Sequence, residues 1–416
     1  MIRRAILGFC ALLACGSVGA ARAADCPAEI KIGHLHATSG PFAAISMPVY
    51  LGLQLWVDAE NANGGAMVKA CGKKVPLKLI SYDDQSNTAT AATLYNQLIT
   101  QDKVNVLIAD SGSVLTSIAV PIAKEHKMFL FDPTGTGAAF FQDNPYIALI
   151  ADPVSSMWPK YVADFLDDDG VKAGLKSVAI LYSTNDFTGT QANAVRGFLN
   201  ASGKLKIVYD QGVPTNTSNY TVLINDIANA KPDAVIELGY VGNDIAFLRN
   251  LQDSGQTFRF LFAIYPGLET SGVLKNVGAD AMKNVFTYVT SAAYAYKPEV
   301  GMDLEQYKSA WEKKYANKNG IEFGFNSVAG YTTALVIQET LNNADSLDQE
   351  SLKKAVFALS GKLKTLDGPF VLDKAGAQIG EITPLGQLEP DGKGGVTLTV
   401  LYPHALANGK AVFGGK

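Results

Sequence analysis

Short apolar runs alternate with amphipathic segments along most of the chain, which is the pattern of an α/β protein. The apolar run at residues 104–109 is short, rich in branched side chains and bounded by turn formers, as a buried parallel strand is. A helix of about ten residues follows it, and residues 128–131 return as the next strand. The pattern therefore predicts a strand–helix–strand unit over 104–141.

The same alternation occurs in two separate runs. The predicted strands of the first run cover residues 29–35, 76–82, 104–109 and 128–131, and residues 145–150 lead on to the second run. Those of the second run cover residues 177–182, 206–209, 234–238, 258–264 and 285–293. Three amphipathic helices follow, over 303–317, 327–342 and 349–360, and then a tail of strand and turn signals from Gly368. Two runs predict two α/β lobes rather than one sheet, with a ligand cleft between them.

Two turns of small polar residues end the strands of the 104–141 unit. The first contains Ser111, Gly112 and Ser113, and the second spans 132–137 with Thr134, Gly135 and Thr136. In an open α/β sheet both turns fall at the carboxyl ends of parallel strands, where ligands bind. Hydroxyls and backbone N–H groups at a helix start suit a carboxylate. The alternative is a pair of ordinary loops with a serine N-cap and turn glycines.

Length and charge exclude some classes of partner. With 416 residues the chain is long enough for two domains with real cores. Its net charge of -4 and its pI near 5.7 provide no basic field, which argues against binding to nucleic acid or to an anionic membrane surface.

The first 23 residues read as a signal peptide. A basic start at Arg3 and Arg4 precedes an apolar stretch over 5–20, and Ala21-Arg22-Ala23 fits a cleavage site. We therefore expect an exported protein cleaved near Ala23. A lipoprotein site at Cys15 is the alternative. No later stretch reaches the 18 or so apolar residues of a membrane helix.

Two cysteines, Cys26 and Cys71, remain after this cleavage. Each lies a few residues before a predicted strand, so adjacent parallel strands would place both at the same sheet end. In an oxidising compartment this predicts a disulfide, with two free thiols as the alternative.

No set of residues for catalysis or metal binding is visible. The sequence contains no nucleophile elbow, phosphate loop or zinc-protease motif. His34 and His36 share one strand face but lack cysteines or clustered carboxylates at ligand spacing. A cleft rich in hydroxyls and N–H groups predicts binding rather than catalysis, with no metal and no cofactor.

The chain resembles the bacterial periplasmic solute-binding proteins of the leucine/isoleucine/valine-binding group, which serve ABC importers. The resemblance covers essentially all of the mature chain. Its marks, in order, are Thr38-Ser39-Gly40-Pro41, Ala59-Glu60-Asn61-Ala62-Asn63-Gly64-Gly65, Tyr82-Asp83-Asp84 and the 104–141 unit.

This resemblance implies a type I periplasmic binding-protein fold, with two Rossmann-like lobes joined by a three-strand hinge. It places the crossings near Ala151, Thr290 and Phe370. Lobe I would contain residues 24–151 with 291–370, and lobe II residues 152–290 with 371–416.

The resemblance also implies a ligand site. The two turns, from Ser111 to Ser113 and from Thr134 to Thr136, would hold a ligand carboxylate, with either Ser111 or Ser113 as the main contact of the first turn. The other lining positions it implies are Phe42, Phe187, Tyr240, Tyr265, Phe325 and Asn326.

One position departs from the family pattern. Amino-acid binders of this group hold the ligand ammonium with an acidic residue where this chain has Tyr265, and Glu269 follows only a few residues later. An aromatic or aliphatic carboxylate, or an amide, would suit this lining equally well.

The function implied is that of an ABC-importer subunit for a hydrophobic amino acid or a related small carboxylate or amide. Its partners would be this ligand and a permease in the inner membrane, and we expect a monomer. The alternative is an extracytoplasmic ligand-sensing receptor domain for an aromatic or aliphatic carboxylate.

Overall fold

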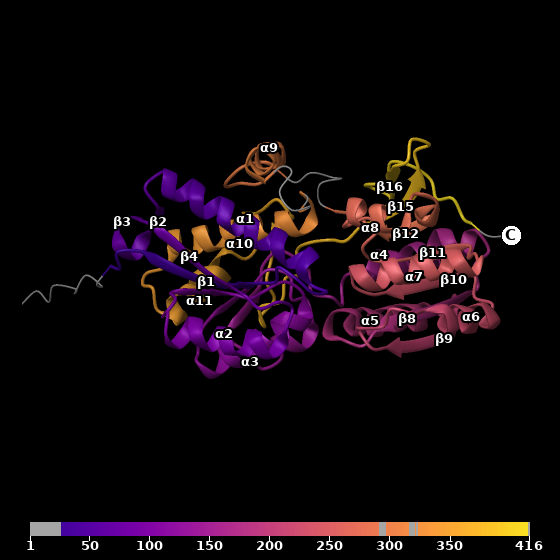
Figure 1. Ribbon diagram of the computed structural model, residues 1–416, viewed down its shortest axis with the longest axis horizontal. Coiled ribbons are helices and arrows are strands. Elements are labelled where there is room, and N and C mark those ends of the chain that lie inside the picture. The colour runs from indigo at the N-terminus through magenta and orange to yellow at the C-terminus, as the bar shows by residue number, and fades with distance from the viewer. Residues whose placement is uncertain (1–25, 291–296, 316–320, 322, 415–416) are drawn as a thin grey trace, which may run out of the picture.

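The computed structural model describes residues 26–290, 297–315, 321 and 323–414. It consists of two α/β lobes that lie end to end, each built around its own parallel sheet (Figure 1). The predicted signal peptide and its cleavage site lie outside the described residues. None of the described helices has the length and apolar character needed to cross a membrane.

The sheet of lobe I has the strand order β4-β1-β5-β6-β7, and every pair in it is parallel. Its strands are β1 (Ile30–His36), β4 (Leu77–Asp83), β5 (Val106–Ile108), β6 (Leu130–Asp132) and β7 (Ile147–Leu149). The strands β5, β6 and β7 are buried throughout because helices cover both faces of the sheet.

Two layers of helices cover this sheet. In Figure 1 the helices α2 and α3 lie on one face, and α1 and α10 lie on the other. The bounds in lobe I are α1 (Ala43–Ala62), α2 (Thr88–Thr100), α3 (Ser113–Glu125), α9 (Leu304–Tyr315), α10 (Phe325–Asn343) and α11 (Gln349–Leu359). Helix α10 is buried along most of its length, so no single apolar stripe marks it in the sequence.

The sheet of lobe II has the order β16-β15-β12-β11-β10-β8-β9. Its first five strands in the chain are parallel: β8 (Ser177–Ser183), β9 (Lys206–Val213), β10 (Ala234–Leu238), β11 (Phe260–Phe262) and β12 (Val285–Tyr288). The tail adds β15 (Leu385–Pro390) and β16 (Val396–Tyr402) as antiparallel strands. The helices are α4 (Lys160–Phe165), α5 (Asp186–Ser202), α6 (Thr221–Ala230), α7 (Val241–Ser254) and α8 (Thr270–Val277).

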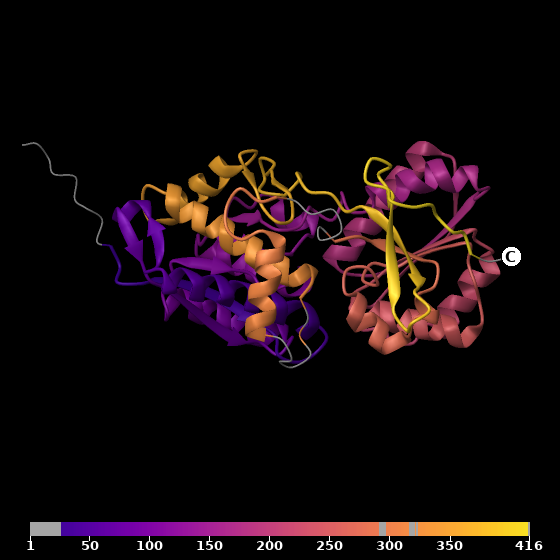
Figure 2. The ribbon, with the colours of Figure 1, turned by 90° about the horizontal axis from the view of Figure 1, so that it is seen from above.

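Three segments connect the lobes, following β7, β12 and the β13–β14 hairpin (Leu363–Lys364 and Pro369–Phe370). The sequence analysis places the third crossing near Phe370. In the structure Leu372 and Ala377 still pack in the cores of lobe I, and the Leu149 N–H donates to the Gly376 carbonyl at 2.9 Å. The chain enters the second sheet at Leu385, so this crossing occupies 378–384. Figure 2 shows the tail passing across to the second lobe.

Some local elements differ from the pattern-based expectation. Helix α1 begins at Ala43 and contains Pro48 in its second turn, although the pattern of apolar residues together with this proline predicts a helix start at Pro48. The sequence analysis also misses α8 and the hairpin of β2 (Ala66–Val68) with β3 (Lys73–Val75). Both are too short to give a clear hydrophobic period.

Cys26 and Cys71 form the predicted disulfide, with Cα atoms 5.4 Å apart. It ties the start of the chain to the turn between β2 and β3. Replacing both cysteines by alanine is expected to lower the free energy of unfolding by about 2–4 kcal/mol, because the bond closes a loop in the unfolded chain. Urea unfolding should show this loss, and adding a reductant should then destabilise the wild type but not the double variant.

Candidate ligand site between the lobes

A narrow cavity of about 10 Å³, room for about one water molecule, lies between the two lobes. Side chains from both lobes close it, so this structure shows the lobes in contact rather than apart. The lining residues are Ile45, Gly112, Thr134, Asp152, Trp158, Phe187, Tyr240, Tyr265, Phe325 and Asn326.

The N-terminus of α3 faces this cavity. Gly112 precedes the helix with φ of 79°, a left-handed conformation that glycine adopts without a steric cost. Its N–H donates to Thr134 Oγ1 at 2.9 Å, which joins the two small-residue turns. The N–H groups of the first helical turn have no partner within the helix, so this end can bind an anionic group.

Buried carboxyl groups fix the first turn from behind. Asp110 Oδ1 accepts hydrogen bonds from the Ser46 hydroxyl at 2.5 Å and from the Ser111 N–H at 2.6 Å. Burial, followed by the nearby Asp84 carboxyl, raises the pKa of Asp110 well above its usual range. Because these bonds determine the backbone of the turn, the α3 N–H groups are held in position before a ligand arrives.

The second turn contributes less to the cavity than the sequence suggests. Asp132 Oδ1 accepts from the Gly135 N–H at 2.7 Å, and burial raises the pKa of Asp132 to about 7. A Cβ on Gly135 would lie 2.4 Å from Thr116 Oγ1, so this residue packs against α3. The Thr136 hydroxyl is hydrogen-bonded to Ser155 Oγ at 2.6 Å. Of the second turn, only Thr134 lines the cavity.

The two serines of the first turn do not line the cavity either. The Ser113 hydroxyl accepts from the Gly137 N–H at 3.1 Å. The Ser111 hydroxyl is buried and has no hydrogen-bond partner among the described residues. Gly112, between them, is the member of this turn that lines the cavity.

Lobe II places a cluster of aromatic rings against the helix end. The Tyr240 ring lies 5.4 Å from Phe187, 6.3 Å from Tyr265 and 5.4 Å from Phe42 of lobe I, measured between centroids. Burial raises the pKa of Tyr240, and the backbone N–H groups of Val114 and Ser113 act in the opposite direction. A Cβ on Gly112 would lie 3.5 Å from the Tyr240 hydroxyl, so this phenol reaches across the cleft to the start of α3.

Polar groups in lobe II hold these tyrosines. Asp244 Oδ2 accepts from the Tyr265 N–H at 2.7 Å, and the Tyr240 N–H donates to Asn243 Oδ1 at 3.1 Å. Burial and the Asp244 carboxyl together raise the pKa of Glu237, whose carboxyl hydrogen-bonds Asp244. Burial also raises the pKa of Asp244, to about 7, so Glu237 is the carboxyl that keeps its proton where the two share this buried site.

Three lining residues are absent from the sequence-based site, namely Ile45, Asp152 and Trp158. Asp152 is 2% exposed and directly follows Ala151, where the sequence analysis places only a crossing, and Trp158 follows it before α4. Burial, followed by the carboxyls of Asp367 and Asp132, raises the pKa of Asp152 well above its usual range. Its position just after β7, at the same sheet edge as the two turns, is the signal that could have identified it.

Glu269 lies at the edge of the cavity rather than in its lining. Its Oε1 accepts from Asn326 Nδ2 at 2.5 Å, which links the lobes at the start of α10. Tyr265 itself lines the cavity, at the position for which the resemblance to the family implies a lining residue.

The structure thus brings most of the predicted residues to one place. Those that line the cavity are Gly112, Thr134, Phe187, Tyr240, Tyr265, Phe325 and Asn326. Phe42 packs edge-on against Tyr240, one layer behind the lining. Ser111, Ser113, Gly135 and Thr136 face their own lobe.

Comparison with known proteins gives a family. Residues 29–393 match the periplasmic binding protein family. The Leu/Ile/Val-binding protein homolog 7 of Brucella abortus (strain 2308) is 25% identical over 396 residues, which cover 93% of this chain and 94% of the relative.

Solved structures share the fold at lower sequence identity. The branched-chain amino acid transporter substrate binding protein LivJ from Streptococcus pneumoniae, in complex with isoleucine, has a TM-score of 0.72 and 19% identity, over 90% of this chain and 100% of that one. A solute-binding protein of an ABC transporter from R. palustris, in complex with benzoate, has a TM-score of 0.71 and 19% identity, over 92% of this chain and 99% of that one. The chain belongs to the periplasmic binding protein family, and it is an extracytoplasmic binding protein rather than an enzyme.

Proposed function

We propose that this chain is the solute-binding subunit of an ABC importer for a hydrophobic amino acid or a related small carboxylate or amide. The observation that carries the proposal is the cavity between the lobes, where the α3 N-terminus faces Phe187, Tyr240 and Tyr265. One side offers N–H groups to a carboxylate, and the other offers apolar rings to a hydrophobic body.

The carboxylate end of the ligand binds at the start of α3. There it takes the place of the Tyr240 phenol, which faces the N–H groups of Ser113 and Val114 in this structure. Thr134 and the backbone of Gly112 complete the contact.

Asp152 determines whether the site can bind amino acids, which carry an ammonium group, in addition to carboxylates that lack one. A ligand ammonium facing the cavity needs a carboxylate, because an unpaired buried ammonium costs several kcal/mol. Asp152 lines the cavity, so an amino acid can be held without an acidic residue at position 265. The neighbours bound to isoleucine and to benzoate support a site of this shape for either class.

Closure and delivery complete the proposed cycle. The lobes would separate about the three crossings to admit the ligand, close over it, and dock on the permease in the inner membrane. This places the mature protein in the periplasm after cleavage near Ala23.

A ligand screen tests this proposal. Thermal unfolding in the presence of branched-chain and aromatic amino acids, aromatic acids and amides should reveal at least one stabilising ligand, since a ligand at 100 times its Kd adds about 2.7 kcal/mol. Mass spectrometry of ligand retained through purification should identify the same class. If no compound shifts the melting temperature and solution scattering shows no compaction, the transport proposal is wrong.

A further inference from the structure

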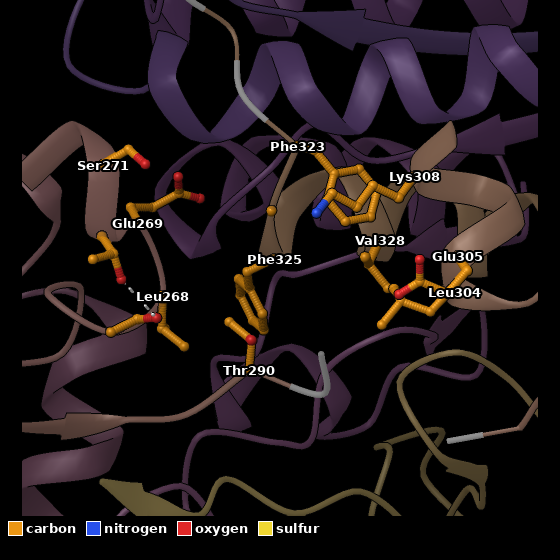
Figure 3. Close-up of a pocket in the computed structure, with 13 residues that line it drawn as sticks. Leu268, Glu269, Ser271, Thr290, Leu304, Glu305, Lys308, Phe323, Phe325 and Val328 are labelled. Atoms are coloured by element: carbon orange, nitrogen blue, oxygen red, sulfur yellow. Dashed lines mark hydrogen bonds between the residues drawn. The ribbon is translucent and has the colours of Figure 1, made fainter. Parts of the chain in front are cut away.

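A second, larger chamber lies between the lobes and shares the lining residue Phe325 with the narrow cavity. This outer chamber has a volume of about 310 Å³ and is formed by both lobes. Lobe II contributes residues 267–271, before and at the start of α8, and lobe I contributes α9 and the start of α10. Figure 3 shows Leu268, Glu269 and Ser271 on one side of it and Leu304 and Lys308 on the other.

The inner cavity and the outer chamber have one lining residue in common. Phe325 lines both of them, and the Asn326–Glu269 hydrogen bond of 2.5 Å crosses from lobe I to lobe II beside it. A ligand body that leaves the aromatic cluster along the Phe325 ring therefore enters the outer chamber. No corresponding room exists in the inner cavity, which is only about 10 Å³ in this structure.

The outer chamber is amphipathic. Leu304, Phe323 and Val328 give it an apolar wall, and Val328 is buried at the base of that wall. Glu305 and Lys308, three residues apart on α9, give it a polar edge. Among the residues that the structure describes, no carboxylate lies within 4.0 Å of the Lys308 ammonium. In Figure 3 the Lys308 side chain extends from α9 toward the hollow.

The charged groups of the chamber suit an uncharged polar group. The lining carries an ammonium on Lys308 and carboxylates on Glu269 and Glu305, so it offers both donors and acceptors. An amide or hydroxyl can use both, because it accepts from the ammonium and donates to a carboxylate.

We propose that the natural ligand is longer than a single branched-chain amino acid: a hydrophobic carboxylate whose far end carries an amide or hydroxyl that binds in the outer chamber at Lys308. This inference rests on the proposed function and specifies its ligand class. The carboxylate binds at α3, the apolar body lies among the aromatic rings and passes Phe325, and the polar end reaches α9.

Matched probe pairs test the proposal by calorimetry. One pair is L-phenylalanine with 4-carbamoyl-L-phenylalanine, and the other is 3-phenylpropanoate with 3-(4-carbamoylphenyl)propanoate. In at least one pair the amide should raise affinity tenfold or more. Lys308→Met, which keeps the apolar stem, should remove that gain and leave the shorter probe unchanged. Lys313→Met, on the same helix but outside the chamber lining, should behave like the wild type.

The failures of the two proposals differ. If the short probes bind and the amide adds nothing, or if Lys308→Met weakens both members of a pair equally, the extended-ligand inference is wrong and the transport function stands. If no member of either pair binds and the wider ligand screen also reveals no stabilising ligand, both proposals are wrong.

Discussion

Asp152→Asn is expected to weaken the binding of ligands that carry an ammonium group by about 2–3 kcal/mol, the strength of a charged hydrogen bond, which is on the order of 100-fold in Kd. The side chain lines the cavity and is 2% exposed, so no water replaces the lost charge. Carboxylates without an ammonium should lose little. Calorimetry measures this difference, with L-leucine and L-phenylalanine as the ligands that carry an ammonium group and benzoate as the carboxylate without one.

The same substitution should change the pH dependence of binding. Burial, with Asp367 and Asp132, raises the pKa of Asp152, so lowering the pH protonates it and removes the partner of the ammonium. The affinity for amino acids is therefore expected to rise with pH across the raised pKa, with release of a proton on binding. Asp132, whose pKa is about 7, titrates in both proteins, so the difference between wild type and variant isolates Asp152.

Controls make the result specific. Asp345→Asn removes a carboxyl that is 71% exposed in its side chain and pairs with Lys69, far from the cavity lining. It should leave every Kd unchanged. If L-leucine binds Asp152→Asn as tightly as the wild type, the ammonium contact lies elsewhere, and Glu269 becomes the residue to replace.

Gly330→Val is expected to give a large loss of stability, about 3 kcal/mol, at the upper end of overpacking effects. A Cβ on Gly330 of α10 would lie 2.3 Å from the Val49 carbonyl oxygen of α1, and one on Gly52 would lie 2.7 Å from the Ser327 carbonyl oxygen. Because the obstructing atoms are backbone, the helices must move apart. The melting temperature should fall by roughly 6–12 °C for lobes of this size.

Gly197→Ala is the matched control for this variant. Gly197 lies inside α5, and a Cβ there would meet nothing within 4 Å. Alanine should raise the free energy of unfolding by about 0.5–1 kcal/mol, because it restricts the unfolded chain without a clash. If Gly330→Val melts within 1 °C of the wild type, the close packing of α1 on α10 is wrong.

The sequence predicts the architecture well, because the alternation of strand and helix in two runs is a local pattern. The pairing of Cys26 with Cys71, 45 residues apart, followed from their positions before two strands expected to be adjacent. It also predicts which strand ends face the cleft, since the carboxyl ends of parallel strands share one edge. The short hairpin of β2 and β3, helix α8 and the position of the third crossing depend on packing against distant segments, and the pattern does not show them.

Within the site, the sequence alone determined the composition of the cleft: two small-residue turns from one lobe and aromatic rings from the other. Only the tertiary structure decided which atoms reach the cavity. Gly135 faces the interior of lobe I because it packs on Thr116, and Thr136 does so because its hydroxyl is hydrogen-bonded to Ser155. Gly112 and Thr134 therefore remain at the surface of the cleft. Asp152 enters the site because the first crossing passes along this edge. The direction of a side chain depends on neighbours far away in the chain, and no local pattern records them.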